Sequence, residues 1–246
     1  MEVHQHSHTE RKKWTHYFWE FLMLFLAVFC GFLAENEREH MIEHKREKQY
    51  IRSLIEDIGK DTAHVTFLTS RYEMIQSHCD SVLINFNEFS KNESTTAAEN
   101  YSRVIFGFPD FSYTDHTMQQ LRNAGGLRLI RNQTAIDSII VYDALARDIK
   151  VEETAIIHYY QTLDDLTNKM LSYRRMNESG NQSIIKGTLG GKKNFWINAD
   201  AGNLEELYNL LYKYKETIKG FVDALAGFKE KGERLIGLLK KEYHLK

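Results

Sequence analysis

Residues 40 to 44 have the types and spacing of a zinc-protease motif. They read HMIEH, which fits H-x-x-E-H, a pattern in which two histidines one helical turn apart bind zinc and the glutamate activates a metal-bound water. A working site also needs a third ligand and a cleft around the metal. Here the neighbouring residues are nearly all charged, which favours a solvated helix with ion pairs three and four residues apart. His40, Glu43 and His44 are candidate functional residues because they match the motif, but their charged surroundings lead us to predict no metal centre.

Glu20 is the second candidate, because it is an acid within an apolar segment. A charged carboxylate at the centre of a bilayer costs about 2.5 to 3.5 kcal/mol even on lenient scales, so an intramembrane acid is a functional hypothesis. Glu20 lies only about a turn and a half beyond Trp14, close to the start of the segment. Three interpretations stay open: placement at the membrane interface, a contact with another helix or partner, and proton-coupled work.

Other patterns indicate no catalytic chemistry. The stretch GTLGGKK resembles a phosphate-binding loop, but Lys186 and Lys193 occupy the positions of its first glycine and its final Ser/Thr. Histidines 4, 6 and 8 lie in a polar tail with no fixed geometry. No Ser-His-Asp or Cys-His arrangement can be identified, and Cys79 falls on an apolar stripe. We predict that the protein is not an enzyme and has no catalytic residues, cofactor or resident metal.

Composition favours an all-α chain. The 246 residues include one proline and 14 glycines, and helices tolerate neither residue well in their interiors. A formal charge of -2 argues against nucleic acid as a partner, because nucleic acid is bound by a basic face. Two cysteines, Cys30 and Cys79, are too few for a disulfide framework.

Residues 14–34 are predicted to be a transmembrane helix. About twenty mostly apolar residues at 1.5 Å each match the ~30 Å of a bilayer core, and aromatic residues cluster at the start. A buried core helix and a cleaved signal are the two alternatives. Arg11, Lys12 and Lys13 favour a cytoplasmic N-terminus, although positive charges also follow the segment. A long C-terminal domain translocates largely regardless of local charge, so we expect it in the periplasm of a bacterial inner-membrane, single-pass protein.

Three apolar stripes with steps of three and four residues follow, and they are typical of coiled-coil-like amphipathic helices. The first runs from Ile51 to Phe86, interrupted by Asp61; the second runs from Tyr142 to Tyr173, with Glu152 as its polar member; the third runs from Leu204 to Leu239, broken at Gly232. Three helices of similar length can bury these stripes on one another. We predict an elongated antiparallel three-helix bundle.

The predicted organisation has four parts. A polar His-rich tail covers 1–13, the transmembrane helix 14–34, a charged juxtamembrane stalk 35–50 and the helical bundle 51–246, with insertions at 89–131 and 177–203. Within the first insertion we expect a short helix that stops at Gly125 and Gly126 and a second long helix capped by Asn132.

Two stretches resemble a known family. RKKWTHYFWEFLMLFLAVFCGFLAENEREHMIEHKREKQYIRSLIEDIGKDT is similar to the opening of an uncharacterised Bacteroidetes family of single-span membrane proteins, with its YF.EF entry, AEN.REH exit and EK.YI.SL..D continuation. The second half of HTMQQLRNAGGLRLIRNQTAIDSIIVYD is similar to a segment of a helix, a turn and a second helix in that family and a related one. The resemblance covers about residues 11 to 62 and 112 to 143. It implies an inner-membrane anchor with a helical exterior domain and no established activity.

The expected function is that of a non-enzymatic, membrane-anchored scaffold or interaction protein of the bacterial envelope. Besides the lipid bilayer, we expect a protein partner or a homo-oligomer. The alternative is an accessory subunit of a membrane transporter or energised complex that uses Glu20.

Overall fold

The computed structural model describes residues 14–123, 125–178 and 195–245. Over these ranges the secondary structure is helical, and the only strand-like pairing is an isolated bridge between Leu171 and Trp196. The predicted all-α class is confirmed. The chain divides into two compact units, Met1–Gln49 and Tyr50–Lys246.

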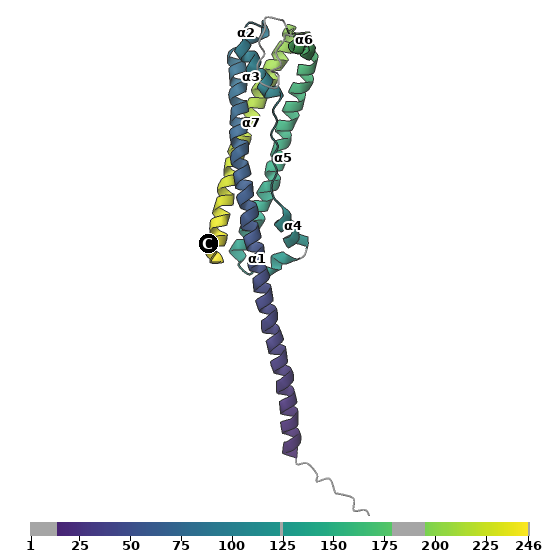
Figure 1. Ribbon diagram of the computed structural model, residues 1–246, viewed down its shortest axis with the longest axis vertical. Coiled ribbons are helices and arrows are strands. Elements are labelled where there is room, and N and C mark those ends of the chain that lie inside the picture. Colours follow the sequence, from purple (N-terminus) through teal and green to yellow (C-terminus); the bar gives the residue numbers. More distant parts are fainter. Residues whose placement is uncertain (1–13, 124, 179–194, 246) are drawn as a thin grey trace, which may run out of the picture. The chain divides into compact units, whose positions relative to one another are not determined.

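Helix α1 (Trp14–Ile84) contains the apolar segment, the charged segment and the first apolar stripe in one continuous element (Figure 1). Its most apolar 18-residue window has a mean hydropathy of 2.0, and none of that window is buried. By length and composition, this part of α1 can cross a membrane. Helix α1 is continuous because it contains few helix breakers: it has no proline and only two glycines, Gly31 and Gly59, in 71 residues.

The second unit buries the three predicted stripes. The stripe of α1 is buried from Ile51 to Val82, and those of α5 (Gln133–Met170) and α7 (Ala201–Glu242) are buried along most of their lengths. The first two stripes were predicted to end at Phe86 and Tyr173, but these residues lie beyond the ends of α1 and α5. Phe86 begins the short helix α2 (Phe86–Ser90), and Tyr173 begins α6 (Tyr173–Glu178).

The prediction that Glu152 is the polar member of the second stripe was wrong. Glu152 is exposed, whereas the next residue, Glu153, is fully buried. Both positions fit a stripe between Ile149 and Ile156, because the steps can run three then four or four then three. Which order occurs depends on the face that α5 turns to its neighbours, and the pattern of apolar residues does not fix this.

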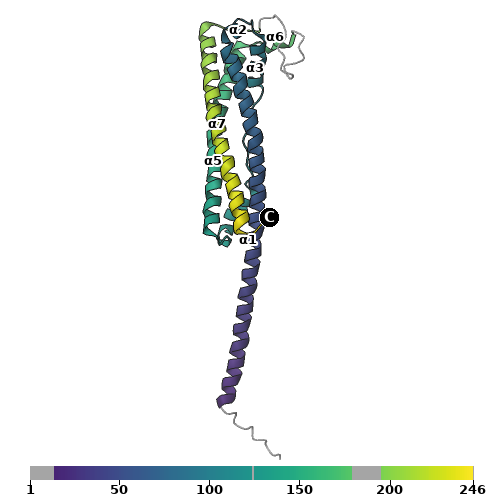
Figure 2. The same cartoon turned by 90° about the vertical axis from the view of Figure 1, so that its left-hand side faces the viewer.

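Ring contacts and one ion pair give the directions of the long helices, which lie side by side in Figures 1 and 2. From α1 to α7, Tyr72 contacts Phe221, and Asp80 pairs with Lys215 further along α1. From α5 to α7, the corresponding pairs are Tyr142 with Phe228 and Tyr160 with Tyr214. Helix α7 therefore runs antiparallel to both α1 and α5, and α1 and α5 run in the same direction.

Two helices that run in the same direction need a connection that returns along their length. Residues 85–131 supply it through α2, α3 (Thr95–Ile105), α4 (His116–Asn123) and a 3-10 turn (Gly126–Leu129). This region was predicted as an insertion, yet it supplies ten apolar residues to the core: Phe89, Ala97, Ala98, Tyr101, Val104, Ile105, Phe111, Met118, Leu121 and Ile130. It forms an additional layer of the core rather than an insertion outside it.

The predicted helix ends in this region are confirmed. Gly125 has a φ of 64°, the left-handed conformation that glycine adopts readily just after a helix. Asn132 accepts a hydrogen bond from the backbone N–H of Ala135 and so caps α5. The second insertion was predicted to extend to residue 203. It ends earlier, because α7 begins at Ala201, directly after its N-cap residue Asp200.

Candidate functional site

Glu20 lies on the exposed surface of α1, and its carboxylate is 3.0 Å from the Nε2 atom of His16. The two residues are four apart, so they lie on neighbouring turns of one helix face. A protonated histidine at this distance neutralises the carboxylate locally. The structure thus gives Glu20 a partner from its own helix, a contact that the sequence prediction did not include.

The HMIEH residues are placed on one stretch of α1, but each histidine has its own carboxylate. His40 is 3.7 Å from Glu43, and His44 is 3.2 Å from Glu47. Ion pairs three residues apart were predicted for this stalk, and the structure shows one between Arg38 and Glu35 at 2.5 Å. No group of three His, Cys, Asp or Glu side chains with the geometry of a metal site occurs in the part of the chain that the structure describes. The histidine tail and GTLGGKK lie outside that part.

Residues 106–115, which we call the crossing segment, have no helical hydrogen bonds over most of their length; they pack against the core and bury Phe111 in it. Buried backbone N–H and C=O groups need partners. Side chains of α1 and α5 supply them: the Phe111 N–H donates to Glu153, and its carbonyl accepts from Lys150 at 2.7 Å. The Pro109 carbonyl accepts from the Tyr72 hydroxyl at 2.6 Å.

Two buried aspartates of α1 continue this pattern. Asp61 accepts a 2.7 Å hydrogen bond from the Thr114 N–H, and Asp57 accepts one of 2.5 Å from the Thr117 hydroxyl. The pKa of Asp61 is raised, chiefly because burial disfavours its charged form, while the hydrogen bonds that it accepts act in the opposite direction. These acids therefore hold the crossing segment and the start of α4 in place.

Asp143 on α5 is the fourth buried acid of the second unit; a fifth, Glu47, belongs to the first unit. It pairs with Arg122 of α4 and Arg147 of its own helix. Of these four acids, the sequence prediction identified only Asp61; in the second stripe it placed Glu152 where the structure buries Glu153. A usable signal was available for Asp57 and Asp143, since each is next to a stripe residue in the sequence, where a buried charged side chain must find a partner.

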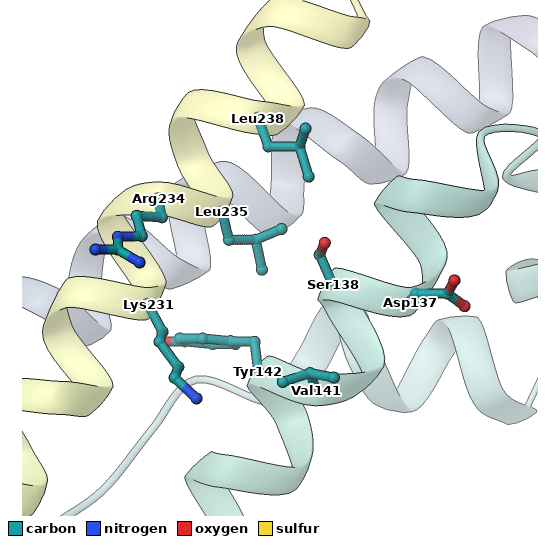
Figure 3. A pocket seen from close by; sticks show the side chains of 8 residues that line it. All are labelled: Asp137, Ser138, Val141, Tyr142, Lys231, Arg234, Leu235 and Leu238. Atoms are coloured by element: carbon teal, nitrogen blue, oxygen red, sulfur yellow. The ribbon is translucent and has the colours of Figure 1, made fainter.

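A groove between α5 and α7 opens on the surface of the second unit (Figure 3). Its volume is about 480 Å³. The residues of α5 that line it are Asp137, Ser138, Val141 and Tyr142, and those of α7 are Lys231, Arg234, Leu235 and Leu238. An open apolar groove with a few polar groups at its edge suits the apolar face of a protein segment.

Tyr142 joins this groove to the buried polar groups. Figure 3 shows its ring extending from α5 towards α7. The ring is stacked on Phe228 with 4.8 Å between centroids, and the hydroxyl donates a 3.1 Å hydrogen bond to Asp61. Both the ring and the hydroxyl of this groove residue are therefore held by contacts with other helices.

The charges of the groove lie on opposite edges. In Figure 3, Arg234 and Lys231 lie on the α7 side, and Asp137 lies on the α5 side. Beside Asp137, α5 also exposes Ile140 (46%) and Val141 (52%), apolar side chains that contribute little to the core. The groove thus combines an apolar floor, an exposed apolar edge and separated charges, which are features typical of surfaces that bind proteins.

Cys79, the nucleophile with the greatest intrinsic reactivity in the second unit, is fully buried on the α1 stripe, as predicted. Burial raises the pKa of its thiol to about 12. Since the thiolate is the reactive form, this cysteine is a packing residue at neutral pH.

No family model matches the chain, and no curated protein and no solved structure is similar to it. Membership of the Bacteroidetes family of single-span proteins therefore stays a prediction.

Proposed function

We propose that this chain is a non-enzymatic, membrane-anchored interaction protein of the bacterial inner membrane. The observation that carries the proposal is the groove between α5 and α7, with its apolar floor and its charges on opposite edges. The titratable side chains buried nearby hold the crossing segment and α4 in place, so their arrangement favours a rigid scaffold over a catalyst.

The anchor of this proposal is the apolar half of α1. Its exposed 18-residue window, aromatic start and lack of burial support insertion in a bilayer. We place the N-terminus in the cytoplasm and the second unit in the periplasm, because Arg11, Lys12 and Lys13 precede the span. The resemblance noted above supports an inner-membrane location.

The second unit is proposed to be an elongated helical bundle built on α1, α5 and α7. Buried stripes on all three helices support it. The predicted antiparallel relation applies to α7 against the other two, and the returning layer of residues 85–131 completes the core. Such a bundle is a stiff support that presents the groove to a partner.

A crosslinking experiment tests the interaction function. A photoreactive amino acid at Val141, in the groove, is compared with one at Phe67, which has a similar exposure (57%) but lies on α1 outside the groove. The full chain is expressed in bacterial inner membranes, irradiated and resolved by mass. We expect a discrete crosslinked protein from position 141 and none of comparable yield from position 67.

Membrane attachment is tested on the same material. We expect the protein to resist extraction by alkaline carbonate and to require detergent, and added protease to digest the second unit only after the outer membrane is opened. Release without detergent would contradict the anchor, and equal crosslinking from both positions would contradict the groove as the interaction surface.

A further inference from the structure

We propose that the groove binds a second copy of this chain, so that two copies pair through a two-fold interface made by α5 and α7. This inference rests on the proposed function and names the partner. A two-fold interface brings the same patch of both subunits together, so the patch must be complementary to itself in shape and in charge.

Shape complementarity comes from a ridge that forms the α5 edge of the groove. Asp137, Ile140, Val141 and Ala144 are spaced at i, i+3, i+4 and i+7 and therefore form one continuous stripe on α5. Its two large apolar members, Ile140 and Val141, are about half exposed. Ridges of this spacing pack into grooves between the side chains of another helix. The patch thus contains a ridge and a groove, and each copy can seat its ridge in the groove of the other.

Charge complementarity comes from the two edges of the groove. Lys231 makes no ion pair among the described residues, whereas Arg234 is paired with Glu230 on its own helix. Asp137 accepts a 2.9 Å hydrogen bond from Gln133 and has no cationic partner in the described part of the chain. A two-fold axis along the helices exchanges the two edges. It therefore sets Asp137 of one copy against Lys231 of the partner subunit, and the same pair forms a second time.

An apolar centre with opposite charges at its two edges is the pattern expected of a specific self-association surface. A partner of uniform charge would match one edge and be repelled by the other. A second copy matches both, which is why we favour self-association over a purely acidic or purely basic partner. Anchoring in one membrane also confines the copies to a layer, which raises their effective concentration.

Charge exchange tests the pairing. The full chain is purified in mild detergent, and its protein mass is measured by light scattering across a concentration series. We expect a dimer for the wild type. Asp137→Lys places two lysines together twice in each dimer, and Lys231→Glu does the same with two acids. Because juxtaposed like charges are strongly unfavourable, we expect each variant to dimerise at least about tenfold more weakly.

Two rescue measurements distinguish pairing from damage to the fold. The double variant Asp137→Lys/Lys231→Glu restores both contacts within one homodimer. A mixture of the two single variants with different affinity tags restores them only in a mixed dimer. We expect the double variant to dimerise like the wild type and the mixture to co-purify in preference to either homodimer.

The matched control exchanges charges elsewhere on an exposed surface. Lys219→Glu and Asp223→Lys alter α7 at exposed positions that do not line the groove, and we expect the wild-type mass for both. A monomeric wild type, or single variants that dimerise as tightly as the wild type, would overturn this inference. A groove crosslink to a different protein, together with a monomeric mass, would overturn self-association while leaving the interaction function intact.

Discussion

The Tyr142 hydroxyl of α5 donates a 3.1 Å hydrogen bond to the Asp61 carboxylate of α1, and the same carboxylate accepts the Thr114 N–H. One acid thus joins two long helices and the segment that crosses between them. The ring of the same tyrosine lines the groove. Stability of the buried polar groups and geometry of the proposed interface are therefore coupled through Tyr142.

Tyr142→Phe is expected to lower the free energy of unfolding by about 1 kcal/mol, because it removes the hydroxyl and leaves one acceptor of Asp61 unused. The ring stack on Phe228 is retained. Chemical denaturation followed by circular dichroism measures the change. An unchanged midpoint would show that this hydrogen bond contributes no net stability.

Asp61 should give the protein an unusual pH dependence. Its pKa in the folded state is raised above the ordinary value of 3.8, mainly by burial. The folded state therefore binds the Asp61 proton more tightly than the unfolded state. The resulting stability is fully present below the unfolded pKa and is lost as the pH rises through the folded pKa. Asp61→Asn, which cannot titrate, removes this contribution at every pH.

The measurement is the difference in unfolding free energy between the wild type and the Asp61→Asn variant from pH 7 to pH 4. Subtraction cancels the titration of the other acids. We expect the difference to move in favour of the wild type as the pH falls. Movement in the opposite direction would mean that hydrogen bonds from Thr114 and Tyr142 outweigh the burial of Asp61.

Gly232 on α7 marks a close approach of three helices. A Cβ atom there would lie 2.9 Å from Thr62 Cγ2, 3.2 Å from Tyr142 Cε2 and 3.3 Å from Ile58 Cγ2. We expect Gly232→Ala to destabilise the protein by about 1 to 3 kcal/mol through overpacking, which exceeds the gain in helix propensity.

Gly227→Ala is the matched control, because Gly227 lies on the same helix and nothing approaches its added Cβ within 4 Å. It should stabilise the protein by about 0.5 to 1 kcal/mol through helix propensity alone. Thr62→Ser removes the methyl group in closest contact and keeps the hydroxyl, so it should partly restore the Gly232→Ala variant. Thermal unfolding compares the wild type, Gly232→Ala, Gly227→Ala and the double variant Thr62→Ser/Gly232→Ala. Equal effects of the two alanine substitutions would refute the close approach at Gly232.

Glu153 and Glu152 are adjacent and chemically identical but differ in burial. Glu153 receives hydrogen bonds from the Phe111 N–H and from Lys150, at 2.7 Å for the lysine. We expect Glu153→Ala to cost about 2 to 4 kcal/mol, because a buried N–H and a cation lose their partner. Glu152→Ala should change stability by less than about 0.5 kcal/mol. Urea denaturation compares them, and similar values would show that Glu153 does not hold the crossing segment.

Glu20 separates the proposed function from the accessory-subunit alternative. Under the interaction function we expect Glu20→Gln to leave membrane abundance and the mass in detergent unchanged, because the groove rather than the span makes the specific contact. Quantitative immunoblotting and light scattering measure both. Loss of a complex while the protein remains at normal abundance would favour a role for Glu20 within the membrane.

Sequence alone determined the helical class, the apolar span, the three stripes and the caps at Gly125 and Asn132. These features depend on local quantities: hydropathy over one helix length, the 3.6-residue period and the conformational preferences of glycine and asparagine. They need no information about which segments meet.

Tertiary structure decided the rest. The sequence prediction missed three of the four buried acids of the second unit. It also left residues 89–131 outside the core, because the crossing segment has no period and takes its hydrogen-bond partners from α1 and α5. The choice between Glu152 and Glu153 and the groove beside Tyr142 likewise depend on how α5 and α7 are rotated against their neighbours. That rotation follows from packing at positions such as Gly232, where contacts between residues far apart in the chain fix what a local pattern leaves open.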